Sequence, residues 1–232
     1  MHITAIVLAA GKGLRLKTKA SKPLIKINSH PLIVYCLNTL SKHPDIKDII
    51  VVANRKNLKD ISHQIRLYRI GKVKDIVLGG RLRRASVMHG LRAVDKRCNF
   101  VLIHDGVRPF IDKKIISSVI KTAARYGAAI TAVPVKATIK SVVRRPSSVA
   151  HDFIVKETLK REKLWEVQTP QVFRRDLILQ AYKKFGNTDV TDDASLVEKL
   201  GRRVKVVTGS YFNIKVTTPE DLVLAEAIAK RL

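Results

Sequence analysis

The sequence is poor in cysteine. Its 232 residues include only two, Cys36 and Cys98, and its histidines are scattered along the chain. Two thiols do not provide the disulfide framework of a small secreted protein. Without clustered histidines they also do not make a zinc site. We therefore expect both cysteines to stay reduced and to pack as small apolar side chains.

Long apolar runs are also missing. A helix that crosses a membrane needs about 20 consecutive apolar residues, and no stretch of the chain approaches that length. The apolar stretch from Ile3 to Ala10 has no basic segment before it and runs directly into a glycine-rich turn. The sequence therefore predicts neither a signal peptide nor a membrane partner, and favours a cytoplasmic protein.

Aromatic and acidic residues are scarce. Aromatics make up 5% of the chain, and 19 Asp and Glu face 45 Lys and Arg, for a formal net charge of +26. Such a balance makes a nucleic-acid-binding module the main non-enzymatic alternative. However, the basic residues are spread over the expected helices and loops, and the few aromatics form no stacking platform. A polyanionic small substrate explains the charge equally well, so we expect no dedicated nucleic-acid partner.

The apolar residues that are present suffice for a core and follow an alternating pattern. Hydrophobic residues make up 46% of a chain whose length fits one α/β domain. Short Ile/Val/Leu runs alternate with helical patterns, which is typical of βαβ units and parallel strands covered on both faces. The expected strands are Ile3–Ala9, Lys47–Ala53, Lys74–Leu78, Phe100–His104 and Ala128–Pro134. The expected helices are Pro31–Lys42, Leu58–Tyr68, Ala85–Val94, Lys113–Arg125, Arg175–Phe185, Asp193–Leu200 and Pro219–Lys230. The fold class is therefore α/β and Rossmann-like, with a mostly parallel, twisted sheet flanked by helices.

One segment, residues 138–157, departs from this alternation. It contains two β-like runs around a Pro-Ser-Ser turn, which predicts a β-hairpin. A polar, exposed hairpin is only marginally stable alone. It is either an arm that protrudes and docks on another subunit of a homodimer, or an ordinary edge hairpin folded back on its own domain.

A glycine-rich turn follows the first expected strand. It carries small residues, glycines and two cations in a fixed order: Ala9, Ala10, Gly11, Gly13, Arg15 and Lys22. Glycines let backbone N–H groups approach an anion closely, and the cations add fixed positive charge. The third glycine of the dinucleotide fingerprint and the Gly-Lys-Ser/Thr of a P-loop are both absent, which disfavours a dehydrogenase and a P-loop kinase. We interpret residues 8–22 as a triphosphate-binding loop and residues 1–232 as a single nucleotidyltransferase domain.

The spacing of this loop resembles that of the nucleotidyltransferases that make activated sugars and polyols. Six further blocks extend the resemblance over nearly the whole chain: Gly79–Leu91, His104–Phe110, Pro134–Lys140, Trp165–Phe173, Thr191–Glu198 and Asn213–Leu222. Together they are similar to the 2-C-methyl-D-erythritol 4-phosphate cytidylyltransferase family of isoprenoid synthesis. The resemblance implies attack of a polyol phosphate on the α-phosphorus of CTP with release of pyrophosphate. A ribitol 5-phosphate or other polyol-phosphate cytidylyltransferase is the enzymatic alternative.

By resemblance, Arg15 and Lys22 are the catalytic residues. Both would stabilise the charge that builds on phosphate oxygens in the transition state, Arg15 as a fork and Lys22 as a point charge. The alternative for Lys22 is a solvated loop lysine. The family's usual Pro-Lys order appears here as Lys22 followed by Pro23.

The resemblance also implies a corner that holds cytosine and ribose. Its residues would be Ala9, Ala10, Gly11, Gly13, Gly79, Gly80 and Ser86. This chain has Arg81 where the family commonly has an acidic residue. An arginine cannot accept a hydrogen bond from the cytosine amino group, so the backbone would have to read the base.

The acceptor side of the site is implied in the same way. Its residues would be Asp105, Arg108, Thr138, Arg161, Thr169 and Lys215, with Thr138 and Arg161 acting across a dimer. Ala137 replaces a typical aspartate, and Lys160 adjoins Arg161, which leaves the register open by one. A purely structural Asp105–Arg108 pair is the alternative for those two residues.

The implied cofactor is Mg²⁺ or another divalent cation. Asp105 is the one candidate carboxylate ligand in the first blocks, so we expect the metal to be held mainly by the triphosphate and water. Five histidines are expected to be surface or packing residues. They are His30, His43, His63, His89 and His151.

Overall fold

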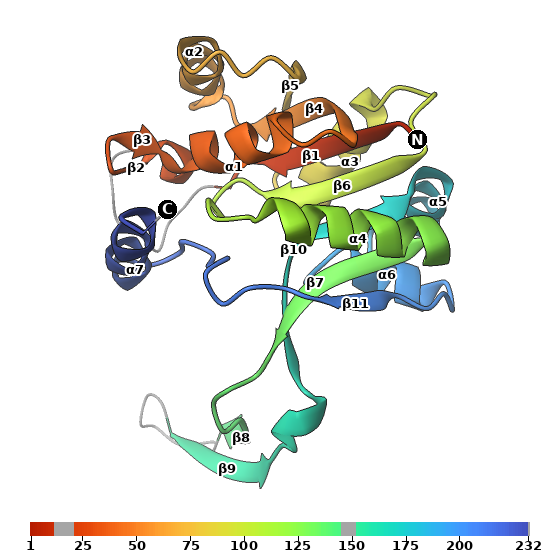
Figure 1. The fold of residues 1–232 in the computed structure, drawn as a ribbon. Coiled ribbons are helices and arrows are strands. Elements are labelled where there is room, and N and C mark those ends of the chain that lie inside the picture. Colours follow the sequence, from red (N-terminus) through yellow and green to blue (C-terminus); the bar gives the residue numbers. More distant parts are fainter. Residues whose placement is uncertain (12–20, 145–151, 232) are drawn as a thin grey trace.

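A seven-stranded sheet with helices on both faces forms the body of the protein, shown in Figure 1 as a computed structural model. The structure describes residues 1–11, 21–144 and 152–231. The sheet contains β1 (Ile3–Leu8), β4 (Ile46–Ala53), β5 (Val73–Leu78), β6 (Phe100–Asp105), β7 (Ala128–Pro134), β10 (Trp165–Arg174) and β11 (Lys205–Thr208). Their order is β11-β7-β10-β6-β1-β4-β5, and only the pairings of β10 with β6 and β7 are antiparallel.

Seven helices accompany the sheet. They are α1 (Leu32–Ser41), α2 (Leu58–Leu67), α3 (Arg83–Ala93), α4 (Lys113–Tyr126), α5 (Arg175–Phe185), α6 (Ala194–Lys199) and α7 (Pro219–Ala229) in the part of the chain described. The short elements are η2 (Lys22–Leu24), β2 (Lys26–Ile27), β3 (His30–Pro31) and η3 (Arg161–Lys163). No described helix is long and apolar enough to cross a membrane.

The core divides into two layers because side chains alternate across each strand. On β1, Ala5 and Val7 belong to the cluster under α1 and α4. The residue between them, Ile6, belongs to the cluster under α3, α5 and α6. Strands buried on both faces therefore read as continuous apolar runs, as the sequence predicted. Cys36 and Cys98 are buried and unpaired, and burial raises the pKa of Cys36 to about 12.

The sequence prediction of this fold is confirmed for the five expected strands and the seven expected helices, with ends that shift by up to two residues. Pro31 precedes α1 instead of starting it. Thr218 caps α7 as expected, and its N–H donates to Asp221 Oδ2 at 2.9 Å. Strands β10 and β11 were missed. Strand β10 contains Pro170, and a proline is unusual in a central strand because it has no N–H to donate. The pairing of β10 with β7 shifts register between Gln168 and Gln171, and this shift accommodates the proline.

A hairpin of β8 (Lys140–Arg144) and β9 (Phe153–Thr158) extends away from the layered body (Figure 1). This confirms the predicted protruding arm. Five large apolar side chains on these two strands are exposed: Val142, Val143, Phe153, Ile154 and Val155. Residues 145–151, which include the whole predicted Pro-Ser-Ser turn, lie outside the described residues.

Candidate active site

The candidate site lies at the carboxyl end of the parallel strands, where α/β sheets place their ligands. Ala9 and Ala10 directly follow β1, Gly79 follows β5, and Asp105 is the last residue of β6. Strand pairing aligns these ends, because Leu8 is paired with both Val52 and Asp105. Residues far apart in the sequence are thereby brought to one edge of the sheet.

The small residues of the two predicted nucleotide-binding blocks pack against each other. A Cβ on Gly79 would lie 2.5 Å from the Cβ of Ala10 and 2.7 Å from Ser86 Oγ. The Gly80 N–H donates to Ser86 Oγ at 3.2 Å, which fixes the start of α3 against this corner. Glycine at position 79 is therefore required for the two blocks to meet. Gly11 is exposed at the same edge, whereas Gly13 and Arg15 fall outside the described residues.

Two asparagines hold both ends of the 12–20 segment. Asn57 is fully buried, and its Nδ2 donates to the Ala9 carbonyl at 2.9 Å and to Ser21 Oγ at 2.8 Å. Asn54 Nδ2 donates to the Ala10 carbonyl at 3.2 Å. Sequence reasoning missed both residues, since an asparagine before a helix reads as an ordinary cap. They hold the predicted triphosphate loop from outside it.

Lys22 begins the short helix η2, where its side chain is held in a defined place. Its Nζ donates to the Thr217 carbonyl at 3.3 Å, and the following Pro23 is buried. The displaced proline therefore anchors the turn while the lysine reaches the segment that carries Lys215. Lys22 is partly buried, and its catalytic role stays a prediction.

Asp105 lies at the centre of three cations. Its carboxylate is 2.7 Å from Lys215 Nζ, 3.8 Å from Arg83 Nε and 3.9 Å from Arg108 Nε. Burial alone raises the pKa of Asp105, but the charge of Lys215, followed by Arg83, outweighs it and holds the pKa well below its usual value. The predicted residues Asp105, Arg108 and Lys215 are thus brought together, and Asp105 stays ionised.

Arg83 is the member of this cluster that sequence reasoning missed. Its Nη2 lies 2.8 Å from Oδ2 of Asp193, a carboxylate with no exposed surface, and the Tyr182 hydroxyl donates to the other oxygen. Burial lowers the pKa of Arg83, but Asp193 and Asp105 raise it overall. In the sequence Arg83 is one of three arginines within four residues. Only the acidic residues of the distant Thr191–Glu198 block could have indicated its partner.

Thr169 and His104 form hydrogen bonds with the backbone of Asp105 and Arg108. The Asp105 N–H donates to Thr169 Oγ1 at 3.0 Å, and the same oxygen lies 3.1 Å from His104 Nδ1. Burial lowers the pKa of His104 to about 4, so its imidazole is neutral at neutral pH and carries one N–H. Nε2 holds that hydrogen because it donates to the Arg108 carbonyl at 3.0 Å, and Nδ1 therefore accepts from the Thr169 hydroxyl. The Thr169 hydroxyl therefore donates its hydrogen to another residue of the protein.

Thr138 and Arg161 lie apart from this cluster. Thr138 is exposed between β7 and β8, and Arg161, in η3, is exposed and donates to the Lys136 carbonyl at 3.0 Å. Thr138 lies two residues before β8 and Arg161 lies three residues after β9, so both are next to the hairpin in the chain. Within one chain they do not join Asp105.

The described side chains do not form a site for a divalent cation. No group of three or more His, Cys, Asp or Glu residues in the described part of the chain could hold one. Asp105 fits a metal poorly because Lys215, Arg83 and Arg108 already surround its carboxylate.

Comparisons with known proteins identify the family and the fold. The model of the 2-C-methyl-D-erythritol 4-phosphate cytidylyltransferase family matches residues 3–231. Proteins of that name from Halalkalibacterium halodurans and Clostridium novyi are 44% and 45% identical, over 98% of this chain and 97% and 96% of theirs. The crystal structure of 4-diphosphocytidyl-2C-methyl-D-erythritol synthase from Anaerococcus prevotii matches with a TM-score of 0.84 at 35% identity, covering 99% of this chain and 96% of that one. The cytidylyltransferase structure from Thermus thermophilus gives a TM-score of 0.75 at 28% identity, covering 99% and 100%.

Proposed function

The chain belongs to the 2-C-methyl-D-erythritol 4-phosphate cytidylyltransferase family, and from that membership we propose its reaction and the roles of its residues. It transfers the cytidylyl group of CTP to 2-C-methyl-D-erythritol 4-phosphate. The products are 4-diphosphocytidyl-2-C-methyl-D-erythritol and pyrophosphate. We assign these roles because three features meet at one edge of the sheet. They are the corner where Ala10 contacts Gly79, the side chain of Lys22, and the Asp105–Lys215 ion pair.

The chemical step joins two anions. An oxygen of the acceptor phosphate forms a bond to the α-phosphorus of CTP as the bond to the β-phosphate oxygen breaks. Catalysis of such a step is mainly positioning and stabilisation of charge on the phosphoryl oxygens. Lys22 is proposed to supply that charge from the Thr217 side of the site, and Arg15 from the loop.

The nucleotide is proposed to bind at the corner where small residues meet. Gly79 and Gly80 present backbone close to Ala10, and Ser86 orders the start of α3. Arg81 is exposed at this corner. Because an arginine only donates hydrogen bonds, we assign base recognition to backbone groups of the two blocks.

The acceptor phosphate is proposed to bind at Lys215. The Lys215 ammonium has three donors, and one of them lies 2.7 Å from Asp105, so the others remain for phosphate oxygens. Asp105 fixes the direction of the lysine and is itself held by Arg83 and Arg108. The ionised carboxylate also suits the hydroxyl groups of a polyol, because it can only accept hydrogen bonds.

Mg²⁺ is proposed to enter with the triphosphate. This cation keeps several of its waters and prefers phosphate oxygens with one or two carboxylates. Asp105 is a poor ligand for the reason given above. We therefore derive no catalytic step that passes through a protein-bound metal.

A homodimer is proposed to complete the site. The exposed apolar residues of β8 and β9 are a surface that a second copy could cover, and Thr138 and Arg161 adjoin these two strands in the chain. Sedimentation of a variant that lacks residues 141–149 tests this proposal. We expect a monomer, and a persistent dimer would contradict the arm as the interface. Since both substrates are charged and water-soluble, the enzyme is proposed to be cytoplasmic.

The function is tested by following pyrophosphate release with each nucleoside triphosphate and each polyol phosphate in turn. We expect release with CTP and 2-C-methyl-D-erythritol 4-phosphate. Release with ribitol 5-phosphate alone would favour the other polyol-phosphate enzyme. No release with any pair, together with tight sequence-independent binding of DNA, would favour the nucleic-acid-binding alternative.

A further inference from the structure

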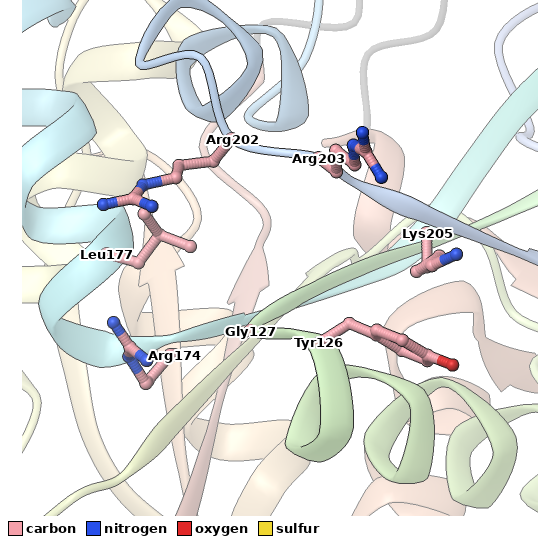
Figure 2. Close-up of a pocket in the computed structure, with 7 residues that line it drawn as sticks. All are labelled: Tyr126, Gly127, Arg174, Leu177, Arg202, Arg203 and Lys205. Carbon is pink, nitrogen blue, oxygen red and sulfur yellow. The ribbon is translucent and has the colours of Figure 1, made fainter.

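A basic pocket lies at the end of the sheet opposite the candidate active site (Figure 2). It forms where β7 and β11 begin and where α4 and β10 end, so its position is at the amino ends of the parallel strands. The seven residues of β7 separate the two edges by about 20 Å at the usual rise of a strand. The pocket is therefore not part of the site that holds Asp105 and Lys22.

Four of the side chains that line this pocket are cations. Figure 2 shows Arg174 and Arg202 on one flank and Arg203 and Lys205 on the other. No carboxylate is among the lining residues in the described part of the chain. The cavity volume is about 380 Å³, which is within the range of pockets that bind small ligands.

The backbone gives the pocket a defined shape. Gly127 ends α4 with a φ of 88°, a conformation that disfavours any residue with a Cβ, so no side chain fills the space above it. Leu177, only 7% exposed, lines the pocket from α5. Lys205 Nζ lies 4.6 Å from the centroid of the Tyr126 ring, which holds this cation at the rim.

The charges in the pocket are not balanced by the protein. Arg174 is paired with Asp176 at 2.6 Å, whereas Arg202, Arg203 and Lys205 have no carboxylate within ion-pair distance among the residues described. Three exposed cations at one pocket repel one another, and the net charge of +26 adds to this potential. A bound anion would relieve that repulsion.

We propose that this pocket is a second anion site that binds a small polyphosphate, with the phosphoryl groups bridging Arg202 on one flank and Arg203 and Lys205 on the other. Cations on two flanks suit a chain of phosphates better than a single ion. The Tyr126 ring already has Lys205 and Arg125 against it, at 4.6 and 5.2 Å. These cations compete with a base for the ring, which disfavours a nucleic-acid strand.

The test is a titration of the ¹⁵N-labelled protein with inorganic tripolyphosphate, followed by NMR in the presence of saturating CTP. CTP occupies the active site, so that site does not report on the added anion. We expect the amide signals of Gly127, Arg203 and Lys205 to shift with a saturable dependence on tripolyphosphate. A variant with Arg202→Gln, Arg203→Gln and Lys205→Gln should bind at least ~10-fold more weakly, since each exposed ion pair contributes a factor of roughly 2 to 5.

The matched control removes the same charge elsewhere. Lys42→Gln, Lys47→Gln and Lys121→Gln alter three exposed lysines that do not line the pocket, and this variant should bind tripolyphosphate as the unaltered protein does. Equal weakening in both variants would show general attraction to a basic protein and overturn the proposal. A single-stranded oligonucleotide that shifts these amides when tripolyphosphate does not would also overturn it. Both variants should release pyrophosphate from CTP at the ordinary rate, so failure here is independent of the proposed function.

Discussion

Arg83 makes its short ion pair with Asp193, a buried carboxylate behind the site, and not with Asp105 inside it. The Arg83 Nη2 to Asp193 Oδ2 distance is 2.8 Å, against 3.8 Å from Arg83 Nε to Asp105. Arg83 therefore connects α6 to the central carboxylate of the site. The position of Arg83 is therefore set by Asp193, a residue that no substrate needs to contact.

Replacing this arginine should destabilise the protein strongly. Arg83→Met leaves the Asp193 charge buried with Tyr182 as its remaining side-chain partner among the described residues, and breaking a buried pair in this way costs about 3–5 kcal/mol. Chemical denaturation measures the loss. Arg84→Met is the matched control, because its partner Asp189 is fully exposed and 3.8 Å away, and it should change stability by less than about 1 kcal/mol.

A second replacement distinguishes an unpaired charge from lost packing. Adding Asp193→Asn to Arg83→Met removes the buried charge, so we expect part of the stability to return. A double variant no more stable than Arg83→Met alone would show that the ion pair is not the cause.

Lys22 should be needed for turnover more than for folding. We expect Lys22→Ala to lower kcat by on the order of 10² or more, as for the loss of one electrostatic stabiliser of the transition state, and the same for Arg15→Ala. Steady-state pyrophosphate release measures this effect. Lys26→Ala, an exposed lysine four residues later, should retain its rate. Full turnover in the Lys22 variant would remove it from the catalytic residues.

Asp105 should not set the affinity for Mg²⁺. Asp105→Asn removes one of the two partners of the 2.7 Å pair with Lys215, so we expect a higher KM for the acceptor phosphate. The magnesium concentration that gives half-maximal rate should stay the same, because the triphosphate supplies the ligands. A large increase in that concentration would show that Asp105 does bind the metal.

His104 should make stability fall below neutral pH. Its pKa is lowered to about 4 in the folded protein, against a reference value of 6.5. Between these two values the unfolded state binds a proton that the folded state does not, so stability is complete above about pH 6.5 and is lost as pH falls towards 4. The slope from this one group is up to roughly 1.4 kcal/mol per pH unit. The lowered pKa of Asp105 contributes only below this window.

Urea denaturation from pH 4.5 to 7 compares the slopes. His104→Gln keeps a donor for the Arg108 carbonyl but does not titrate, so its stability should depend less on pH than that of the unaltered protein. The exposed His63→Gln should leave the slope as it is. Identical slopes in all three proteins would reject His104 as the source.

Much of the fold followed from the sequence because buried parallel strands and amphipathic helices carry strong periodic signals. Strand β10 did not, since Gln168, Thr169 and Pro170 interrupt its apolar pattern and take their places through contacts made only in the folded chain. The site shows the same division. The glycine-rich turn was predicted from its local pattern and the Gly79–Ser86 corner from the family resemblance, whereas Asn57 and Arg83 act through partners more than 30 residues away.

The central claim is tested most directly by a competition between two acceptors in one reaction. The enzyme is given CTP with equal concentrations of 2-C-methyl-D-erythritol 4-phosphate and ribitol 5-phosphate, and ³¹P NMR follows the diphosphate products. We predict that 4-diphosphocytidyl-2-C-methyl-D-erythritol accumulates together with pyrophosphate while ribitol 5-phosphate remains. Preferential consumption of ribitol 5-phosphate, or loss of CTP without any diphosphate product, would contradict the account.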